Sequence, residues 1–314
     1  VFSGKTKIAY FILDPFARPS KRGGAWCNDL RTRRRLPDGS WQLPVAINVA
    51  NFAKSSPTLL THRDVETLSA VDLTVDRGEV VGIAGVSGNG QRELAECLIG
   101  DRPLESGQIS VGGTDLTGAS PQQFVDAGVS FVPEDRYEYG CAPDLSVMHN
   151  AGLKVYRNGE LETDSLLLDY DEMERYADQL VEEFDVRGVE DVRETVAGDL
   201  SGGNLQKLIL AREMSREPEL LIANQPTRGV DVGAIERIRE LMLEQRKDGT
   251  GVLLISEDLD ELLDMSDRIL VMYDGEFVFE TTPEATDKWE LGIYMSTGTG
   301  PDSADQTEQI EGLQ

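Results

Sequence analysis

The sequence predicts an α/β fold built on a mainly parallel sheet. Apolar runs with the length of buried strands occur at residues 80–84, 129–133, 220–223, 252–255 and 269–272. Helical patterns lie between several of these runs, so most strands are expected to be joined by right-handed crossovers. Such a sheet is covered on both faces, and its ligands bind beyond the carboxyl ends of the strands.

Further segments complete the expected fold. Apolar spacing predicts helices at residues 232–246 and 258–265, and a hairpin arm at residues 109–116 turns at two glycines. Residues 171–184 carry an apolar stripe at helical spacing, which is typical of a helix that packs against a core. We therefore expect a small helical insert at about residues 137–195.

The composition excludes several classes of protein. The chain has 314 residues, of which 39% are apolar, and this is enough for a sizeable core. A net charge of −27 argues against a nucleic-acid partner, because phosphate binding depends on clustered Lys and Arg. Three scattered cysteines form no metal or disulfide pattern and fit a reducing setting. No apolar run is long enough to predict a membrane span, and no export signal is expected.

The charge divides the chain near residue 63. Residues 1–63 carry 11 bases and 3 acids, whereas residues 64–314 carry 19 bases and 54 acids. The first segment is expected to be irregular, and is either a basic arm for an anionic surface or a linker foreign to the folded domain. The acidic remainder is typical of a halophilic surface, where salt screens self-repulsion. We expect the folded domain at residues 64–285 and an acidic tail at residues 286–314, disordered from residue 300.

A glycine-rich loop, G-V-S-G-N-G-Q-R, follows the first buried strand and leads into a helix. Its glycines have the G-x-x-x-x-G spacing of a phosphate-binding loop, but Gln91 and Arg92 stand where that motif has Lys and Ser or Thr. The ammonium for terminal phosphates and the hydroxyl for magnesium are both missing. The residues of this glycine loop that we expect at a nucleotide are Gly85, Val86, Ser87, Gly88, Asn89, Gly90, Gln91 and Arg92.

A second polar turn opens the segment L-S-G-G-N-L-Q-K at residues 200–207. Ser201 is expected to cap the helix that follows, with the N–H groups of Gly202 and Gly203 directed toward an anion. On its own, such a turn is as typical of an ordinary helix start as of a phosphate contact. The segment L-L-I-A-N-Q-P-T-R-G-V-D-V-G-A, at residues 220–234, follows one helix later.

These motifs, in this order, resemble the ATP-binding cassette of ABC transporters. The resemblance also includes V-P-E-D-R at the end of a strand and S-E at residues 256–257, and it covers about residues 64–285. It implies a P-loop NTPase fold with an antiparallel β arm and a small α-helical subdomain. More narrowly, the motifs are similar to the second, C-terminal cassette of the tandem ATPase subunits of nucleoside and simple-sugar importers.

The resemblance implies that the chain's own nucleotide site is degenerate. Asn224 stands where the magnesium-associated aspartate belongs, and Gln225 stands where the catalytic glutamate belongs. Glu257 replaces the switch histidine, and Glu134 replaces the glutamine that contacts metal and water. Loss of a general base alone costs on the order of 10² to 10⁴ in rate, so this site is expected to hydrolyse ATP poorly or not at all.

The signature turn, defined as residues 201–204, is intact. By resemblance Ser201, Gly202, Gly203 and Asn204 close over ATP and Mg²⁺ bound to a partner cassette, and Asp231 crosses the interface beside them. Backbone donors placed in this way stabilise developing charge on the transferred phosphate. The chain would thus contribute to hydrolysis in the site of its partner.

Partners and location are also implied by the resemblance. They are a competent second cassette, transmembrane permease subunits and, indirectly, a solute-binding lipoprotein, which place the chain peripherally on the cytoplasmic face of the cell membrane. Two alternatives remain open at this point. One is a regulatory or scaffold cassette that binds nucleotide without hydrolysis, and the other is a truncated product without activity.

Overall fold

The computed structural model describes most of the chain as two compact units. The described residues are 68–69, 71–104, 106–156 and 168–301, with the backbone of three short strands before them. The helical unit contains residues 132–216 and 226–238, and the sheet unit contains residues 44–131, 217–225 and 239 onward. Both units combine segments that are distant in the sequence.

A six-stranded sheet forms the centre of the sheet unit. Its strand order is β12-β11-β5-β10-β9-β8, in which β10 is parallel to β5 and β9, β11 is parallel to β5, and β12 is antiparallel to β11. The predicted mainly parallel sheet is therefore confirmed. The strands are β5 Val80–Ala84, β8 Val129–Val132, β9 Leu220–Asn224, β10 Gly251–Ser256, β11 Arg268–Tyr273 and β12 Glu276–Thr281.

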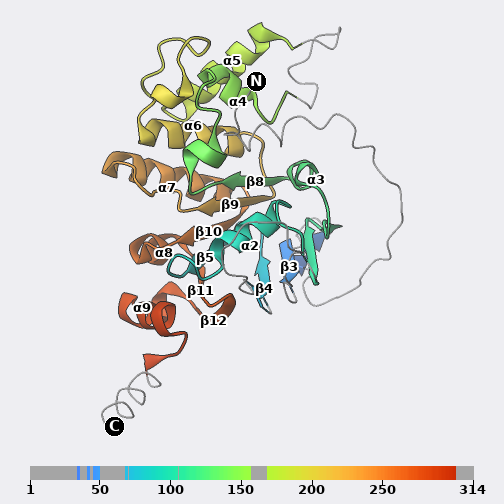
Figure 1. The fold of residues 1–314 in the computed structure, drawn as a ribbon, viewed down its shortest axis with the longest axis vertical. Helices are drawn as coiled ribbons and strands as arrows, with labels where there is room; N and C mark the ends of the chain where they lie inside the picture. The colour runs from blue at the N-terminus through green and yellow to red at the C-terminus, as the bar shows by residue number, and fades with distance from the viewer. Residues whose placement is uncertain are drawn as a thin grey trace, which may run out of the picture. The chain divides into compact units, whose positions relative to one another are not determined.

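Burial explains why the central strands are uninterrupted apolar runs. Every residue of β5, β9 and β10 is buried, as expected for parallel strands covered on both faces. Helix α8 packs on β5 and β10, and α9 packs on β11 (Figure 1). The helices of this unit are α2 Gln91–Leu98, α3 Pro121–Asp126, α8 Leu259–Met265 and α9 Lys288–Thr297, and α7 Val232–Lys247 ends in it.

A second sheet forms the predicted antiparallel arm. Its order is β4-β3-β6-β7, and its strands are β4 Val71–Val75, β3 Val45–Val49, β6 Gln108–Val111 and β7 Thr114–Asp115. Strand β3 lies within residues 1–63, where the sequence predicts no regular element. Five residues are too few for a clear alternation, and pairing with β4 and β6 over a long sequence distance defines this strand.

The C-terminal part of the sheet unit also departs from expectation. Residues 286–314 are predicted to form an acidic tail, but α9 occupies residues 288–297 of it. Leu291 and Met295 are buried, and Asp287 caps the helix by accepting from the Glu290 N–H at 2.9 Å. The helix is held by this apolar face and its cap. Residues 302–314, where disorder is predicted, lie outside the described residues.

Three helices form the core of the helical unit. They are α4 Val147–Gly152, α5 Tyr170–Glu183 and α6 Gly202–Met214, and each packs on the other two (Figure 1). A π-helix, η1 Arg136–Gly140, lies against α6. A 3₁₀ turn, η2 Ala197–Asp199, comes directly before α6 in the sequence. Helices α4 and α5 lie within the segment predicted as a helical insert, of which residues 157–167 are not described, and α6 follows that segment.

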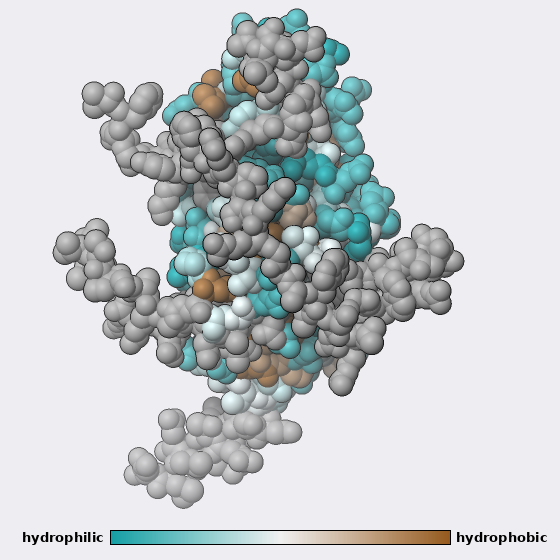
Figure 2. Space-filling view, turned by 90° about the vertical axis from the view of Figure 1, so that its right-hand side faces the viewer, coloured by the Kyte–Doolittle hydropathy of each residue, from teal (hydrophilic) through white to brown (hydrophobic). Residues whose placement is uncertain are grey.

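The part of the surface that is coloured in Figure 2 is mainly hydrophilic. On this face, hydrophobic residues form small patches among hydrophilic ones. Several acids have a structural role at helix starts, where Asp169 and Asp258 accept backbone N–H groups; such caps contribute about 1 kcal/mol each. Among the described helices, none has both the length and the apolar content needed to cross a membrane.

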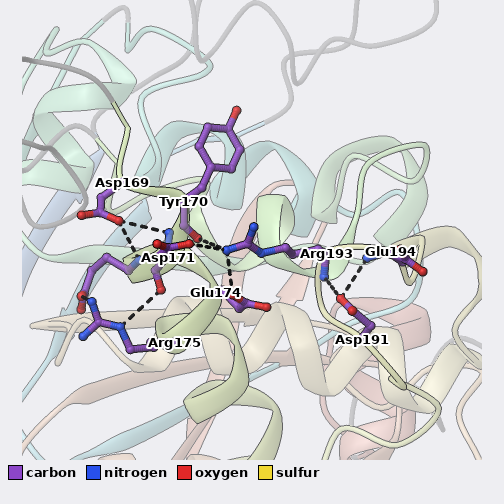
Figure 3. A network of polar contacts seen from close by, with 9 residues as sticks. Asp169, Tyr170, Asp171, Glu174, Arg175, Asp191, Arg193 and Glu194 are labelled. Atoms are coloured by element: carbon purple, nitrogen blue, oxygen red, sulfur yellow. Dashed lines mark hydrogen bonds and ion pairs between the residues drawn. The ribbon is translucent and has the colours of Figure 1, made fainter.

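One ion network joins the first turn of α5 to the turn before η2. Arg193 Nη2 lies 2.7 Å from both the Asp171 and Glu174 carboxylates and donates to the Tyr170 carbonyl at 3.3 Å (Figure 3). Asp191 accepts the Arg193 N–H at 2.7 Å. The turn before η2 is thereby tied to the first turn of α5, although exposed ion pairs of this kind contribute little stability individually.

A second charged group is buried inside the helical unit. The Glu213 carboxylate is fully buried and accepts from Arg212 Nε at 3.0 Å, and it forms an ion pair with Lys154. Arg212 Nη2 also donates to the Gly140 carbonyl at 2.8 Å. Burial lowers the pKa of the Lys154 ammonium, while the adjacent Glu213 carboxylate acts in the opposite direction.

Candidate functional site

The sheet unit brings three predicted segments to one edge. In the strand register, Ala84 pairs with Ser256, and Ile255 pairs with Asn224. The glycine loop, residues 224–225 and Glu257 therefore all leave the sheet at the carboxyl ends of adjacent parallel strands, which is the usual ligand position in such folds.

Gln91 closes the glycine loop with its side chain. Its Nε2 donates to the Val86 carbonyl at 3.1 Å, and the residue is buried. A Cβ at Gly85 would lie 2.1 Å from Gln91 Nε2 and 2.9 Å from the Met272 carbonyl oxygen. Gln91 thus occupies the space above Gly85 and shapes the loop with a neutral amide. Gly90, with φ of 109°, provides the left-handed turn into α2.

This close approach gives a stability prediction. Gly85→Ala should lower the free energy of unfolding by about 1–3 kcal/mol, because the added methyl overlaps the Gln91 amide and a fixed carbonyl. Gly292→Ala is the matched control, since a Cβ there has no neighbour within 4 Å. Urea unfolding of both variants measures the difference. An unchanged midpoint for Gly85→Ala would contradict the described loop closure.

Asn89 and Arg92 contact protein groups around the loop. Asn89 Oδ1 accepts the Asp274 N–H at 3.1 Å, and the Asn89 carbonyl accepts the Gly275 N–H at 2.9 Å. The loop is thereby fixed to the turn between β11 and β12. Arg92 Nε lies 2.8 Å from the Glu96 carboxylate, one turn further along α2.

Gln225 and Glu257 meet at the strand ends. Gln225 Oε1 accepts the Glu257 N–H at 3.4 Å, and the Gln225 N–H donates to the Ile255 carbonyl at 2.8 Å. Gln225 has φ of 52°, a conformation that is sparsely populated for residues with a side chain and clusters at functional sites. Asn224, the preceding residue, is buried at the end of β9.

The residue types at this edge fit Mg²⁺ poorly. Magnesium sites in proteins usually supply one or two carboxylates. Gln91, Asn224 and Gln225 offer only neutral amides, and among the predicted residues at this edge Glu257 alone carries a carboxylate. Within the described residues there is no group of three or more His, Cys, Asp or Glu side chains suited to a metal. We therefore derive no metal-dependent step at this edge.

The helical unit contains the signature turn, and Ser201 caps α6 as predicted. Its hydroxyl accepts the Asn204 N–H at 3.4 Å and Asn204 Nδ2 at 2.9 Å. Asn204 Oδ1 in turn accepts the Arg187 N–H at 2.9 Å. The serine and asparagine side chains thus hold one another, and Asn204 also ties the turn to the chain after α5.

Asp231 lies beside the second glycine of the signature turn. A Cβ at Gly203 would lie 2.9 Å from the Ala234 Cβ and 3.0 Å from Asp231 Oδ2. Asp231 Oδ1 accepts the Ala234 N–H at 3.0 Å, which caps the start of α7. The structure therefore brings two predicted site segments together, with a glycine as the only residue that fits between them.

Lys207 anchors the signature helix on its buried side. Its ammonium donates to the Asp185 carbonyl at 2.7 Å and lies 3.2 Å from the Asp185 carboxylate. Hydrogen bonds from Arg187 and Lys207 hold the pKa of Asp185 below its usual range. Sequence reasoning missed Asp185 and Arg187, because they precede the turn by more than ten residues and carry no motif.

Glu134 and Arg136, in the loop after β8, contact the signature turn and the segment next to it. Glu134 forms an ion pair with Arg228, and Arg136 donates to the carbonyls of Gly202, at 3.2 Å, and Arg228. Glu134 is a predicted site residue, but sequence reasoning gave no role to Arg136. The signal was present in the E-D-R that follows a buried strand, since charged residues at strand ends often line ligand sites.

A family model described as ABC transporter matches residues 68–228. This match covers half of the chain and includes the glycine loop, the signature turn and the end of β9. The chain belongs to the ABC transporter family. The predicted fold class, that of an ATP-binding cassette, is thereby confirmed.

Curated relatives of this cassette are import ATP-binding proteins. The glucose import ATP-binding protein TsgD13 of Haloferax volcanii is 63% identical over 251 residues, which are 80% of this chain and 45% of that protein. The nucleoside import ATP-binding protein NupA of Lactococcus lactis is 43% identical over 231 residues, which are 74% of this chain and 45% of that protein. The cassette spans about half the length of the curated relatives it matches.

Solved structures support the fold. The dimeric post-hydrolysis structure of the cassette MJ0796, bound to ADP and Pi, has a TM-score of 0.64 at 19% identity and covers 77% of this chain and 100% of its own. A nucleotide-free ABC transporter cassette has a TM-score of 0.58 at 20% identity, and the match covers 76% of this chain and 92% of that cassette.

A second family model, peptidase family M3, matches residues 1–69. This match lies almost entirely before the ABC transporter match. It falls on the basic segment that the charge balance separates from the rest of the chain. It is too short to assign a family to the chain as a whole.

Proposed function

We propose that this cassette serves an ABC importer of nucleosides or simple sugars. Relatives named for glucose and nucleoside import support this substrate class. We further propose that it corresponds to the second, C-terminal cassette of a tandem ATPase subunit. The motifs of residues 200–207 and 220–234 support that position.

The cassette's own nucleotide site is proposed to bind ATP with little or no hydrolysis. The glycine loop offers backbone N–H groups to phosphates, and such groups bind anions without a metal. No carboxylate stands at Gln225 to act as a general base, and no ammonium stands at Gln91 for the terminal phosphates. Phosphoryl transfer depends on these groups for positioning and charge neutralisation.

The signature turn is proposed to act in the site of a partner cassette. There Ser201 and the N–H groups of Gly202 and Gly203 contact the γ-phosphate, while the partner supplies Mg²⁺ and the base. The observation that supports this role is the intact and well-braced signature turn, which contrasts with the altered residues of the cassette's own site. Donors fixed in advance stabilise transition-state charge most effectively.

The proposed partners follow from this role. They are a competent cassette, transmembrane permease subunits and, indirectly, a solute-binding lipoprotein, with the cassette peripheral on the cytoplasmic face of the membrane. The acidic composition and a relative from Haloferax support work at high salt. Within residues 1–63, strand β3 pairs with β4 and β6 and so belongs to the fold of the cassette. Only the basic part of the chain before this strand is proposed to be a linker.

A mixing assay tests the proposed function. ATP turnover is measured in concentrated KCl with Mg²⁺, for this chain alone and for a mixture with the competent cassette of the same importer. We expect turnover only in the mixture, and a decrease of at least about 10² with Ser201→Ala. Turnover by the isolated chain would contradict the degenerate site.

The same assay separates the two alternative functions. ATP binding without turnover, even with the partner, would indicate a regulatory cassette. Neither binding nor turnover would indicate a truncated, inactive product. Isothermal titration of the isolated chain with ATP provides the binding measurement.

A further inference from the structure

Arg136 lies where three segments of the helical unit meet. It is the first residue of η1, and its Nη1 donates to the Gly202 carbonyl at 3.2 Å. Its Nη2 donates to the Arg228 carbonyl, in the segment that leads to Asp231. The two acceptors are 66 and 92 residues away in sequence, so one side chain fixes the loop after β8, the signature turn and the segment before α7.

Two glycines make room for this guanidinium. A Cβ at Gly202 would lie 2.7 Å from Arg136 Nη1, so any larger residue there would displace the guanidinium. A Cβ at Gly229, where φ is 65°, would lie 3.4 Å from Nη2. The first signature glycine therefore accommodates Arg136, in addition to the phosphate contact that its N–H group is proposed to make.

The other end of η1 is also joined to α6. Arg212 Nη2, near the end of α6, donates to the Gly140 carbonyl at 2.8 Å, and Gly140 is the last residue of η1. A Cβ at Gly140 would lie 2.7 Å from the Ile209 Cδ1, so the two helices pack closely. One arginine from each helix thus connects η1 to α6 at both ends.

We propose that Arg136 is a positioning residue for hydrolysis in the partner's site. Its planar fork holds Gly202 and Arg228 at once, so the signature turn and the Asp231 segment present a fixed set of donors. Lysine, which has a single point charge, can replace only part of this geometry. The inference rests on the proposed function in trans. It adds that the loop after β8 sets the position of the signature turn.

The test compares Arg136→Gln, Arg136→Lys and the control Arg175→Gln, which removes an exposed arginine of α5. In the mixture with the competent cassette, Arg136→Gln should lower kcat by about 10- to 100-fold, because small displacements of positioned groups have effects of this size. Its KM for ATP should stay within about twofold. Arg136→Lys should have a kcat between those of Arg136→Gln and wild type. If the substitutions only impaired folding, both variants would contain less active protein, and their kcat values would not follow this ranking.

A second readout is independent of the partner. Amide hydrogen exchange in the first turn of α6 should become faster in Arg136→Gln and remain unchanged in Arg175→Gln. If the wild-type mixture shows no turnover, the proposed function fails. Faster amide exchange in Arg136→Gln would still support the inference that Arg136 holds the signature turn in place. Unchanged exchange together with an unchanged kcat would overturn the inference. If Arg136→Gln does not fold, Arg136→Lys carries both measurements, with an intermediate effect expected in each.

Discussion

Gly203→Val is expected to reduce ATP turnover by the mixed cassettes by at least about 10², the effect of losing one preorganised donor. The Cβ would lie 2.9 Å from the Ala234 Cβ and 3.0 Å from Asp231 Oδ2. Both neighbours belong to the capped start of α7, so the signature turn must move away from Asp231. In the proposed role in trans, the N–H groups of the turn would then no longer match the γ-phosphate in the partner's site.

The matched control for this change is Gly233→Ala. A Cβ at Gly233 would lie 3.5 Å from Asp231 Oδ1, which is an ordinary contact, and alanine favours the helix that it enters. Its turnover should stay within about twofold of wild type. Steady-state phosphate release from the mixture measures both variants. Equal turnover of Gly203→Val and wild type would show that the signature turn does not act in the partner's site.

Glu213→Ala should be the most destabilising change in the helical unit, with a loss of about 3–5 kcal/mol. The substitution leaves the buried Arg212 guanidinium and the Lys154 ammonium without their carboxylate. A buried charge without a partner is costly because the interior cannot replace its hydration. The free energy of unfolding in urea, at fixed salt concentration, measures this loss.

Glu174→Ala is the control for this prediction. Glu174 pairs with Arg193 at 2.7 Å, but 37% of its side chain is exposed, so its removal should cost less than about 1 kcal/mol. Higher salt should not rescue Glu213→Ala, because screening has little effect on buried pairs. Similar losses for the two variants would indicate that Glu213 is hydrated in solution.

The sequence predicts the central strands and the signature cap because local pattern decides both. Buried parallel strands need uninterrupted apolar runs, and a serine before a helix caps it in most contexts. Strand β3 and helix α9 were missed for the opposite reason. Pairing with β4 and β6 over a long sequence distance defines β3, and the sparse apolar face of α9 is covered only in the folded unit.

Motif spacing identifies candidate site residues, but it does not predict their contacts. It marks Gln91 as a departure from a phosphate loop, but it does not predict that the amide turns back to the Val86 carbonyl. It makes Asp231 a candidate site residue, and the contact with Gly203 appears only when the start of α7 packs beside α6. The role of Arg136 depends on two backbone carbonyls, which carry no sequence signal.

Vanadate trapping with a photoactivatable ATP analogue tests the central claim most directly. The mixture of this chain and its competent partner is incubated with the analogue, Mg²⁺ and vanadate, which retains the hydrolysed nucleotide where turnover occurs. We predict that the trapped label is found on the partner alone, and that Ser201→Ala in this chain abolishes it. Trapped label on this chain would show that its own glycine loop turns over ATP and would contradict the proposed division of roles.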